Sequence, residues 1–479
     1  MTTPLVSPGS NAQQTPRSAT CLSNPLERQS EVGLKVLFVN DSTSSSNWGD
    51  RAAAFSLKAM VTEAGGQISG IITEEDLAHT RFRKRHKEHH RSSVDRRRAI
   101  LRSVIPPALI VARRRLFKGV DVTTENRVIP ERWEGFGRAA DLAMASHEGP
   151  WPWLRAAIRE ADLVVIHGDG AMTGDGIIPR TDLFLAFLAR ERLSTSVVLV
   201  NHSADFDRPE LRRMAEHVYP LLADVVFRDP VSATRWGHLG GGRFAADSAF
   251  WFTPASREAW VPIAGRPTYF DVWPDTAPFD PAAPYLCVGG SSLHSTAWRP
   301  LELARSYAAL IARLRAVYGG QILLTCSGLQ ELEALRPVAC ELDLPLVSPT
   351  IPVQQAVDIL GNADAYVGGR WHSAIFALRG GAPVVPLSAK QGKMGSLMQA
   401  ADLPAAEFDA FGVDRDGEAI ARALRSLLDG GDALRGRLRS WADGMAVNCW
   451  ENVAYIRRMA AQMSRRESEP AGSGKPLSG

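Results

Sequence analysis

Residues 365–387 read AYVGGRWHSAIFALRGGAPVVPL, and this stretch decides the fold of the second half of the chain. Ala365 to Val367 and Val384 to Leu387 are short apolar runs, which are typical of buried strands. The segment between them has a helical pattern that contains Ile375 and Phe376. A helix between two buried strands predicts a β-α-β unit with parallel strands.

The same alternation extends towards the N-terminus in two blocks, which a Pro-rich stretch from Pro262 to Pro284 separates. Further strands of the second block are predicted at Tyr285 to Val288, Gln321 to Thr325 and Pro345 to Val347. Those of the first block are predicted at Leu34 to Val39, Gln67 to Ile72, Asp162 to Ile166, Val197 to Val200 and Asp224 to Phe227. We therefore predict an α/β protein with two similar units, whose ligands bind at the carboxyl ends of the strands.

The predicted domain boundaries follow from these blocks. We expect a disordered tail at 1–32, an N-terminal domain at 33–261, a linker at 262–284, a C-terminal domain at 285–433, a helical segment at 434–463 and a second disordered tail at 464–479.

Composition excludes several classes of protein. The 479 residues are 45% hydrophobic and 22% charged, and no uncharged apolar run is long enough to span a membrane. Five cysteines without CxxC spacing argue against a disulfide framework and a zinc cage. The first thirty residues lack the pattern of a secretory signal. We therefore expect a cytoplasmic protein.

Positive charge is concentrated in an insertion from His79 to Lys118, which contains 14 Lys or Arg and two Asp or Glu. The simplest interpretation of this insertion is a loop that is exposed to solvent. A second is peripheral contact with an anionic membrane or a lipid-linked substrate, which would place the protein at the inner face of the membrane. Binding of nucleic acid by this insertion is disfavoured, because aromatic residues are not interleaved with the positive charges. His86, His89 and His90 lack the acidic or Cys partners expected of a metal site.

Polar residues follow several predicted strands of the first unit. Asn47 and Asp50 stand between a strand and a helix, where Asp50 either faces a ligand or acts only as a capping residue. Asp169 belongs to a Gly-rich turn that lacks the lysine of a phosphate-binding loop. His202 follows the strand at 197–200, where a proton-transfer role and a structural role are equally compatible with the sequence. Arg228 follows the next strand and either binds an anion or pairs with a nearby Asp.

The second unit has the most informative cluster. Arg370, Trp371 and His372 lie where a strand meets a helix, so guanidinium, imidazole and free helix-start amides share one site that can hold a dianion and donate a proton. Lys390 and Lys393 follow the next strand, where each either binds the same anion or is a surface charge.

These motifs together resemble the polysaccharide pyruvyl transferase family over about residues 34 to 402, the insertion excepted. The resemblance rests on N-x-G-D at 47–50, the Gly-rich turn after Ile166, VFRDPVSA at 226–233, ADSAF at 246–250 and GGRWHSAIFALRGGAPVVPLSAK at 368–390. The last block is the most distinctive. Residues 201–205 depart from the family, since they read NHSAD where many members have a Gln-Ser-Ile-Gly run.

The resemblance implies a GT-B-like architecture of two Rossmann-like domains around a cleft. It implies transfer of the pyruvyl group of phosphoenolpyruvate to a sugar of a cell-surface or exported glycan, or of its lipid-linked precursor, without metal or cofactor.

The resemblance also suggests roles for the candidate residues. Arg228, Arg370, Trp371 and Lys390 are then expected to bind phosphoenolpyruvate, and Asn47, Asp50 and Asp169 to bind the acceptor sugar. His372 and His202 are expected to transfer protons, in roles that can be exchanged. Two other functions stay open: a GT-B glycosyltransferase that uses a nucleotide sugar, and a non-catalytic glycan-binding protein.

Overall fold

The computed structural model describes residues 33–77, 129–174, 176–267, 269, 277–295, 300–389 and 392–468. The basic insertion predicted at 79–118 and Lys390 lie outside the described residues, as do residues 1–32 and 469–479. Within the described part, no helix is both long enough and apolar enough to cross a membrane.

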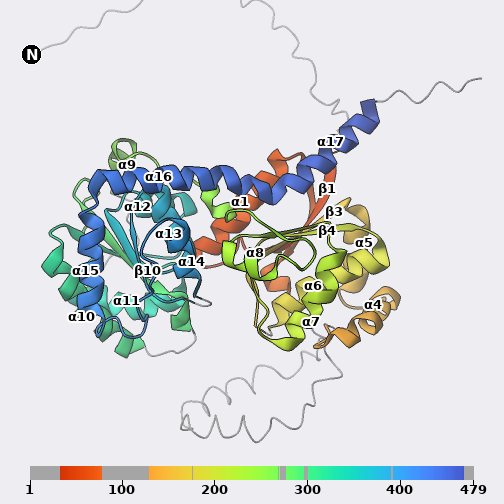
Figure 1. Ribbon diagram of the computed structural model, residues 1–479, viewed down its shortest axis with the longest axis horizontal. Coiled ribbons are helices and arrows are strands. Elements are labelled where there is room, and N and C mark those ends of the chain that lie inside the picture. The colour runs from red at the N-terminus through yellow and green to blue at the C-terminus, as the bar shows by residue number, and fades with distance from the viewer. Residues whose placement is uncertain are drawn as a thin grey trace, which may run out of the picture. The chain divides into compact units, whose positions relative to one another are not determined.

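The first unit is built on a parallel sheet of six strands in the order β2-β1-β3-β4-β5-β6. Its strands are β1 (Leu34–Asp41), β2 (Gly66–Thr73), β3 (Leu163–Thr173), β4 (Ser196–Asp205), β5 (Asp224–Phe227) and β6 (Arg243–Phe244). Its helices are α1 (Trp48–Glu63), α4 (Phe136–Ala145), α5 (Trp151–Glu160), α6 (Ile177–Leu193), α7 (Pro209–Val218) and α8 (Pro230–Trp236). The strand interiors are apolar runs because helices cover both faces of the sheet, as Figure 1 shows.

The second unit has a parallel sheet of five strands in the order β11-β10-β7-β8-β9. Its strands are β7 (Tyr285–Ser291), β8 (Gln321–Thr325), β9 (Leu346–Val347), β10 (Ala365–Gly369) and β11 (Val384–Pro386). Its helices are α9 (Arg257–Ala264), α10 (Pro300–Val317), α11 (Leu329–Leu342), α12 (Val353–Gly361), α13 (Trp371–Arg379), α14 (Lys393–Ala400) and α15 (Gly417–Leu428). The two sheets confirm the predicted α/β fold with two Rossmann-like domains.

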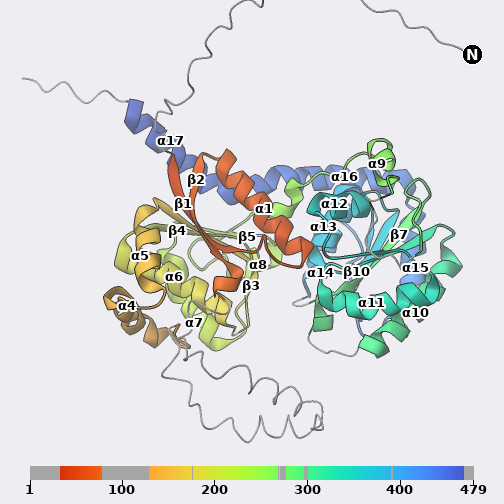
Figure 2. The same ribbon diagram turned by 180° about the vertical axis from the view of Figure 1, so that it is seen from behind.

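The last helices return from the second sheet to the first. α16 (Gly431–Asn448) lies against α13, and α17 (Ala454–Ser468) packs on β1 and β2, as the views in Figures 1 and 2 show. Between them, Asn452 accepts a hydrogen bond from the Asn201 amide at 3.0 Å and donates one to the Ala246 carbonyl at 2.9 Å. The helical segment predicted near the C-terminus therefore fastens the two sheets together.

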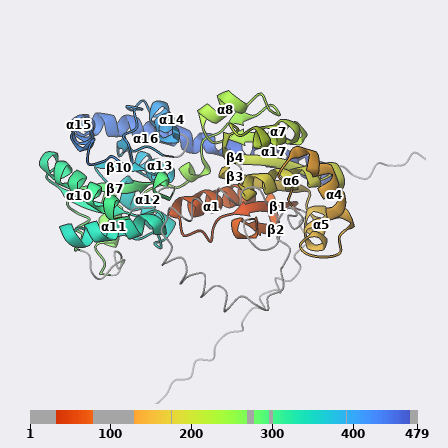
Figure 3. The same cartoon turned by 90° about the horizontal axis from the view of Figure 1, so that it is seen from below.

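Helix α1 makes a second connection between the sheets. It follows β1 of the first sheet but also packs against α12 and α13 of the second, and Figure 3 shows it between the two sheets. Trp48 Nε1 donates to Ser373 Oγ at 3.3 Å, and Arg51 donates to the carbonyl of Pro349 at 3.1 Å. The start of α1 is thus held against the start of α13.

Each sheet has a point at which the chain reverses its direction of travel across the strands. In the first sheet β1 lies between β2 and β3, and in the second β7 lies between β8 and β10. Open parallel sheets bind ligands beyond the carboxyl ends of the strands at such switch points. The topology therefore places the candidate site beyond β1 and β3 of one sheet and beyond β7 and β10 of the other.

Candidate functional site

A cavity of about 310 Å³ lies at these strand ends. Both switch points contribute to its wall, through Asn40 near the end of β1, Asp169 in β3, Ser292 after β7 and Arg370 after β10. Its other lining residues are Ser42, Asn47, Trp48, Asp50, Glu74, Gly170, Ala171, Ile178, Arg228, Ser327, Trp371, His372, Ser373 and Lys393. Residues of both sheets therefore face one cavity.

Arg228 is held rigidly at the carboxyl end of β5. Its guanidinium forms ion pairs with Asp169 and, at 3.0 Å, with Asp247, and its Nε donates to Ser203 Oγ at 3.0 Å. Burial by itself would raise the pKa of Asp169, but the charges of Arg228 and His372 lower it to about 2. The two carboxylates stay ionised and fix the guanidinium in one orientation.

Arg370 faces the same cavity from the second sheet. Its Nε donates to Glu331 Oε1 at 2.7 Å, and this buried carboxylate also accepts from the amide and hydroxyl of Ser327. Nη1 and Nη2 of Arg370 have no hydrogen-bond partner among the described residues, so they are available to an anion. The start of α13, with its free amides, lies directly after Arg370.

Lys393 is a third cation in the cavity wall. Burial and the nearby Arg228 lower the pKa of its ammonium group to about 8. A β-carbon placed on Gly170 would lie 3.3 Å from Arg228 Nη2 and 3.9 Å from Lys393 Nζ, so the two cations flank this bare stretch of backbone. Lys393 Nζ has no ion-pair partner within the described ranges, which leaves its charge for a ligand.

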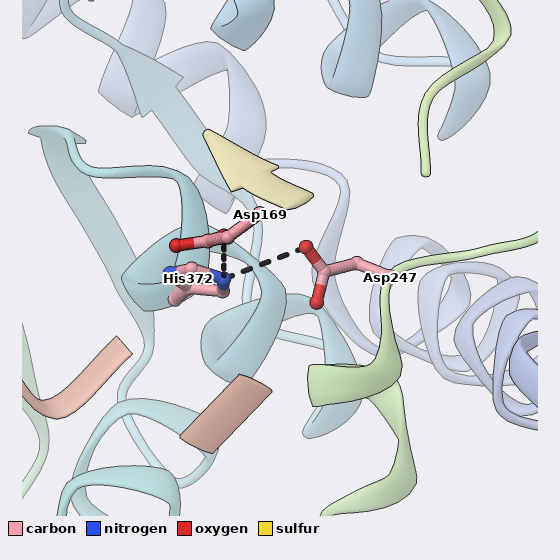
Figure 4. Close-up of side chains that lie close together, drawn as sticks. All are labelled: Asp169, Asp247 and His372. Atoms are coloured by element: carbon pink, nitrogen blue, oxygen red, sulfur yellow. Dashed lines mark ion pairs between the residues drawn. The ribbon is translucent and has the colours of Figure 1, made fainter. Parts of the chain in front are cut away.

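His372 lies in the first turn of α13, between two carboxylates. Its Nε2 is 3.4 Å from Asp247 Oδ2 and 4.0 Å from Asp169 Oδ1, as Figure 4 shows. On the other side of the ring, a β-carbon at Gly49 would overlap the imidazole, so the glycine of the N-x-G-D motif allows the start of α1 to approach His372. Two sequence motifs from different sheets therefore meet at this histidine.

Asp169, Asp247 and His372 also lie as close together as the ligands of a metal ion, within 4.8 Å of one another. Asp247 Oδ2, however, already accepts from Arg228 at 3.0 Å and from the indole nitrogen of Trp371 at 2.9 Å. A metal would need the lone pairs that these donors use, and it would be repelled by the guanidinium. The cluster fits a histidine held by carboxylates better than it fits a metal centre.

The other side of the cavity is acidic. Asn47 caps α1 by accepting from the Gly49 amide at 2.8 Å, and Asp50 accepts from Ser45 Oγ at 3.2 Å. Burial and the charge of Asp169 raise the pKa of Asp50. Burial, Asp50 and Asp169 raise the pKa of Glu74 to about 7. Carboxyl and amide groups of this kind bind sugar hydroxyls by hydrogen bonds.

His202 lies elsewhere, inside the first unit. Its Nδ1 is 2.9 Å from the Val226 carbonyl and its Nε2 is 3.0 Å from the Tyr219 hydroxyl, and the ring is fully buried. Burial lowers the pKa of His202 to about 3, so the ring is neutral. Both ring nitrogens have hydrogen-bond partners within the fold, so the surroundings of His202 are those of a structural residue.

The structure thus brings seven of the nine residues predicted from the sequence to one cavity: Asn47, Asp50, Asp169, Arg228, Arg370, Trp371 and His372. His202 is not in its lining, and Lys390 lies outside the described residues. Sequence reasoning missed Asn40, Ser42, Glu74, Ser292 and Ser327. Each of them follows or ends a strand, so their position relative to the sheet edge is the signal that could have found them.

Several solved structures are similar to this one over most of its length. S. aureus MnaA in complex with UDP has a TM-score of 0.50 at 12% identity, with 92% of this chain and 100% of that chain covered. Arabidopsis thaliana UGT89C1 with quercetin has a TM-score of 0.48 at 12% identity, with 90% and 99% covered. UDP-GlcNAc 2-epimerase from Neisseria meningitidis has a TM-score of 0.45 at 10% identity, with 90% and 100% covered. At such identities the first of these similarities shows a GT-B-type fold and no activity.

No curated protein sequence matches the chain. A family model does: the model of polysaccharide pyruvyl transferase matches residues 47–391, which begin at the N-x-G-D motif and end just after the Arg-Trp-His block and the strand that follows it. The match covers most of the chain and includes every described residue of the cavity from Asn47 to His372. The chain therefore belongs to the polysaccharide pyruvyl transferase family.

Proposed function

We propose that this protein transfers the pyruvyl group of phosphoenolpyruvate to a sugar and releases phosphate. One observation carries the proposal: Arg228 of the first unit and Arg370 of the second line a single small cavity together with His372. A donor with two anionic groups needs more than one fixed cation, and it needs a proton donor within reach.

The cavity has the charges that phosphoenolpyruvate requires. Its carboxylate and phosphate would lie among Arg228, Arg370 and Lys393, and the free Nη atoms of Arg370 suit the bidentate binding of either group. The amides at the start of α13 add a further anion site. Trp371 contributes by orienting Asp247, to which its indole donates, rather than by a charge.

His372 is the proton donor in this proposal. Its Nε2 lies near the carboxylates of Asp247 and Asp169, and it has no hydrogen bond of good geometry within the described part of the chain. When the imidazolium gives its proton to C3 of the donor, the electron pair of the double bond forms the new C–H bond. C2 then becomes electrophilic and accepts the oxygen of a sugar hydroxyl. His202 has no part in this step.

The acceptor is placed on the acidic side of the cavity. Asn47, Asp50 and Asp169 are the proposed partners of its hydroxyl groups. The sugar would belong to a cell-surface or exported glycan, or to its lipid-linked precursor, and the reaction would occur in the cytoplasm. Contact with an anionic membrane through residues 79–118 suits a lipid-linked acceptor. Every step can be carried by the chain's own side chains, and the proposal includes no cofactor.

A nucleotide-sugar glycosyltransferase is the second candidate, because one protein with a similar fold was solved with UDP bound. The volume of the cavity argues against it. Small-molecule sites range from about 300 to 1,000 Å³, and about 310 Å³ suits a small donor and part of a sugar better than a nucleotide diphosphate with its sugar. The clustered cations likewise disfavour a binding protein for neutral glycans.

A transfer assay tests the proposal. The full-length protein is incubated with phosphoenolpyruvate and glycan fractions of the source cells, and phosphate release and the mass of the glycans are measured. We expect phosphate release that depends on the glycan, with a matching pyruvyl increase in glycan mass. Transfer from a nucleotide sugar, with no turnover of phosphoenolpyruvate over all fractions, would refute the proposal.

A further inference from the structure

We propose that Glu74 is the general base that removes the proton of the attacking sugar hydroxyl, and that Asn40 orients this hydroxyl. The inference deepens the proposed function and rests on it. It assigns a residue to the removal of the hydroxyl proton, a step that His372 as proton donor does not perform. Neither residue belongs to the motifs from which the family is recognised.

The two residues come from adjacent strand ends. In the first sheet Asp41 of β1 pairs with Thr73 of β2, so Asn40 precedes this pair on one strand and Glu74 follows it on the other. Both residues line the cavity. They therefore face the same ligand from neighbouring positions at the carboxyl edge of the sheet.

The side-chain oxygen of Asn40 is available to accept a hydrogen bond from a ligand. Its backbone is in the left-handed region, with a φ of 66°, and its Nδ2 donates to the His167 carbonyl at 2.7 Å. This hydrogen bond fixes the orientation of the amide, because only the nitrogen can donate. The side chain is nearly fully buried, and Oδ1 has no hydrogen-bond partner in the described part of the structure. A buried acceptor of this kind is satisfied when a ligand hydroxyl donates to it.

The other carboxylates near the cavity are already engaged. Asp169 and Asp247 are paired with Arg228, which makes them weak bases. Asp50 lies close enough to His372 and Arg370 to feel their positive charges, and it accepts a hydrogen bond from Ser45. Glu74 has neither a hydrogen bond nor an ion pair among the residues that the structure describes, so its oxygens are free to receive a proton.

The electrostatic surroundings of Glu74 suit this role. The groups that affect it are carboxyls on three other elements: Asp50 of α1, Asp169 of β3 and Asp182 of α6. Burial and the charge of Glu74 raise the pKa of Asp182 far above its usual range, so Asp182 is neutral. Burial, Asp50 and Asp169 bring the pKa of Glu74 to about 7, where a group is most effective as a base at neutral pH.

The step balances as follows. The hydroxyl oxygen forms a bond to C2 of the donor while its O–H bond breaks, and the proton goes to a Glu74 oxygen. At the same time C3 takes a proton from His372. The adduct keeps the phosphate until the second hydroxyl of the sugar forms its own bond to C2. The O–H bond of this hydroxyl breaks and its proton returns to the neutral His372, while the C2–O bond to the phosphate breaks with its electron pair on the phosphate, which takes the proton held by Glu74. The products are the ketal and inorganic phosphate, and both side chains are back in their starting states.

The pH dependence of turnover tests this assignment. With saturating donor and acceptor, we expect kcat of the wild-type protein to rise with pH through an apparent pKa near 7, because Glu74 must be ionised to act. Glu74→Gln should lose about 10²-fold or more in kcat and should lose this rise, while donor affinity by calorimetry stays unchanged. Glu75→Gln is the matched control, since Glu75 is the next residue and is exposed.

A second variant guards against a folding defect. Glu74→Ala has room for a small carboxylate, and added formate should restore part of its turnover while leaving the wild type unaffected. Full activity of a folded Glu74→Gln variant with an unchanged pH profile would overturn the assignment, as would a loss of activity that formate does not restore although the donor still binds. If the wild type itself neither binds phosphoenolpyruvate nor transfers its pyruvyl group, the proposed function fails instead.

Discussion

Nε2 of His372 lies 3.4 Å from Oδ2 of Asp247, and this contact joins the start of α13 in the second unit to the segment that follows β6 in the first. The same carboxylate oxygen accepts from Arg228, so one buried anion orients both the proposed proton donor and a proposed donor-binding cation. Neither sheet alone provides this arrangement. The site exists only because the two units meet.

Replacing His372 separates catalysis from binding. His372→Gln removes the proton donor but keeps a polar side chain of similar length. We expect kcat to fall by about 10² to 10⁴-fold, with the affinity for phosphoenolpyruvate changed little. Steady-state kinetics and calorimetry on the same preparation provide the two values. Wild-type turnover in this variant would remove His372 from the mechanism.

Replacing His202 should have the opposite effect. His202→Ala leaves the Tyr219 hydroxyl and the Val226 carbonyl buried without their partner, and each such loss costs about 1 to 3 kcal/mol. We expect a lower thermal midpoint and, at temperatures where the variant is folded, turnover close to that of the wild type. If turnover falls sharply while the midpoint is unchanged, His202 acts in catalysis after all.

A single methyl group at Gly49 tests the contact between α1 and His372. Gly49→Ala places a β-carbon inside the imidazole, so His372 must move away from its carboxylates and activity should be lost. Gly137→Ala is the matched control, because Gly137 is also the second residue of a helix and a β-carbon there meets nothing within 4 Å. Equal activities of the two variants would show that the position of His372 does not matter.

Arg370 has a structural partner as well as a proposed ligand. Arg370→Ala would leave the Glu331 carboxylate buried and without its ion pair, which costs about 3 to 5 kcal/mol of folding stability. With this variant, a loss of binding could not be separated from a loss of folding. Arg370→Lys keeps the positive charge but removes the fork that binds an anion with two nitrogens. We expect it to fold and to bind phosphoenolpyruvate at least about tenfold more weakly, a change of about 1.4 kcal/mol. Undiminished affinity would contradict the donor-binding role.

Acid should weaken the fold through Asp169. Its pKa is about 2 in the folded protein and about 4 in an unfolded chain, so its ion pair with Arg228 stabilises the fold above pH 4. This contribution is lost as the pH falls from about 4 towards 2. Denaturant titrations over this range should show a smaller loss of stability for Asp169→Asn than for the wild type. Parallel curves for the two proteins would mean that the ion pair does not form.

The sequence predicted the fold well because buried parallel strands are apolar runs that can be read directly. The two-residue strand β6 was missed because Arg243–Phe244 is not an apolar run, whereas the equally short β9 was predicted from the apolar Leu346–Val347. The strand at 163–173 continues beyond its apolar core into the Gly-rich turn, so Asp169 is held by the sheet itself rather than by a loop.

Only some residues of the candidate site were predicted from the sequence, and the reason is physical. Arg228, Arg370 and His372 stand in recognisable motifs at strand ends. The raised pKa of Glu74 comes from burial and from the charges of Asp50 and Asp169, none of which can be read from the residues next to it in sequence. His202 occupies the same kind of position, but its ring turns inward to Tyr219, and no sequence pattern reveals this direction. The position of each site residue relative to a strand could be predicted from the sequence, but the partners of its side chain could not.

Isothermal titration calorimetry with phosphoenolpyruvate tests the central claim most directly, with Arg228→Lys and Arg370→Lys as variants and a UDP-sugar as the competing ligand. The account predicts one site per chain that binds phosphoenolpyruvate, weaker binding in each variant, and no displacement by the UDP-sugar. A folded wild-type protein that binds the UDP-sugar and not phosphoenolpyruvate would contradict it.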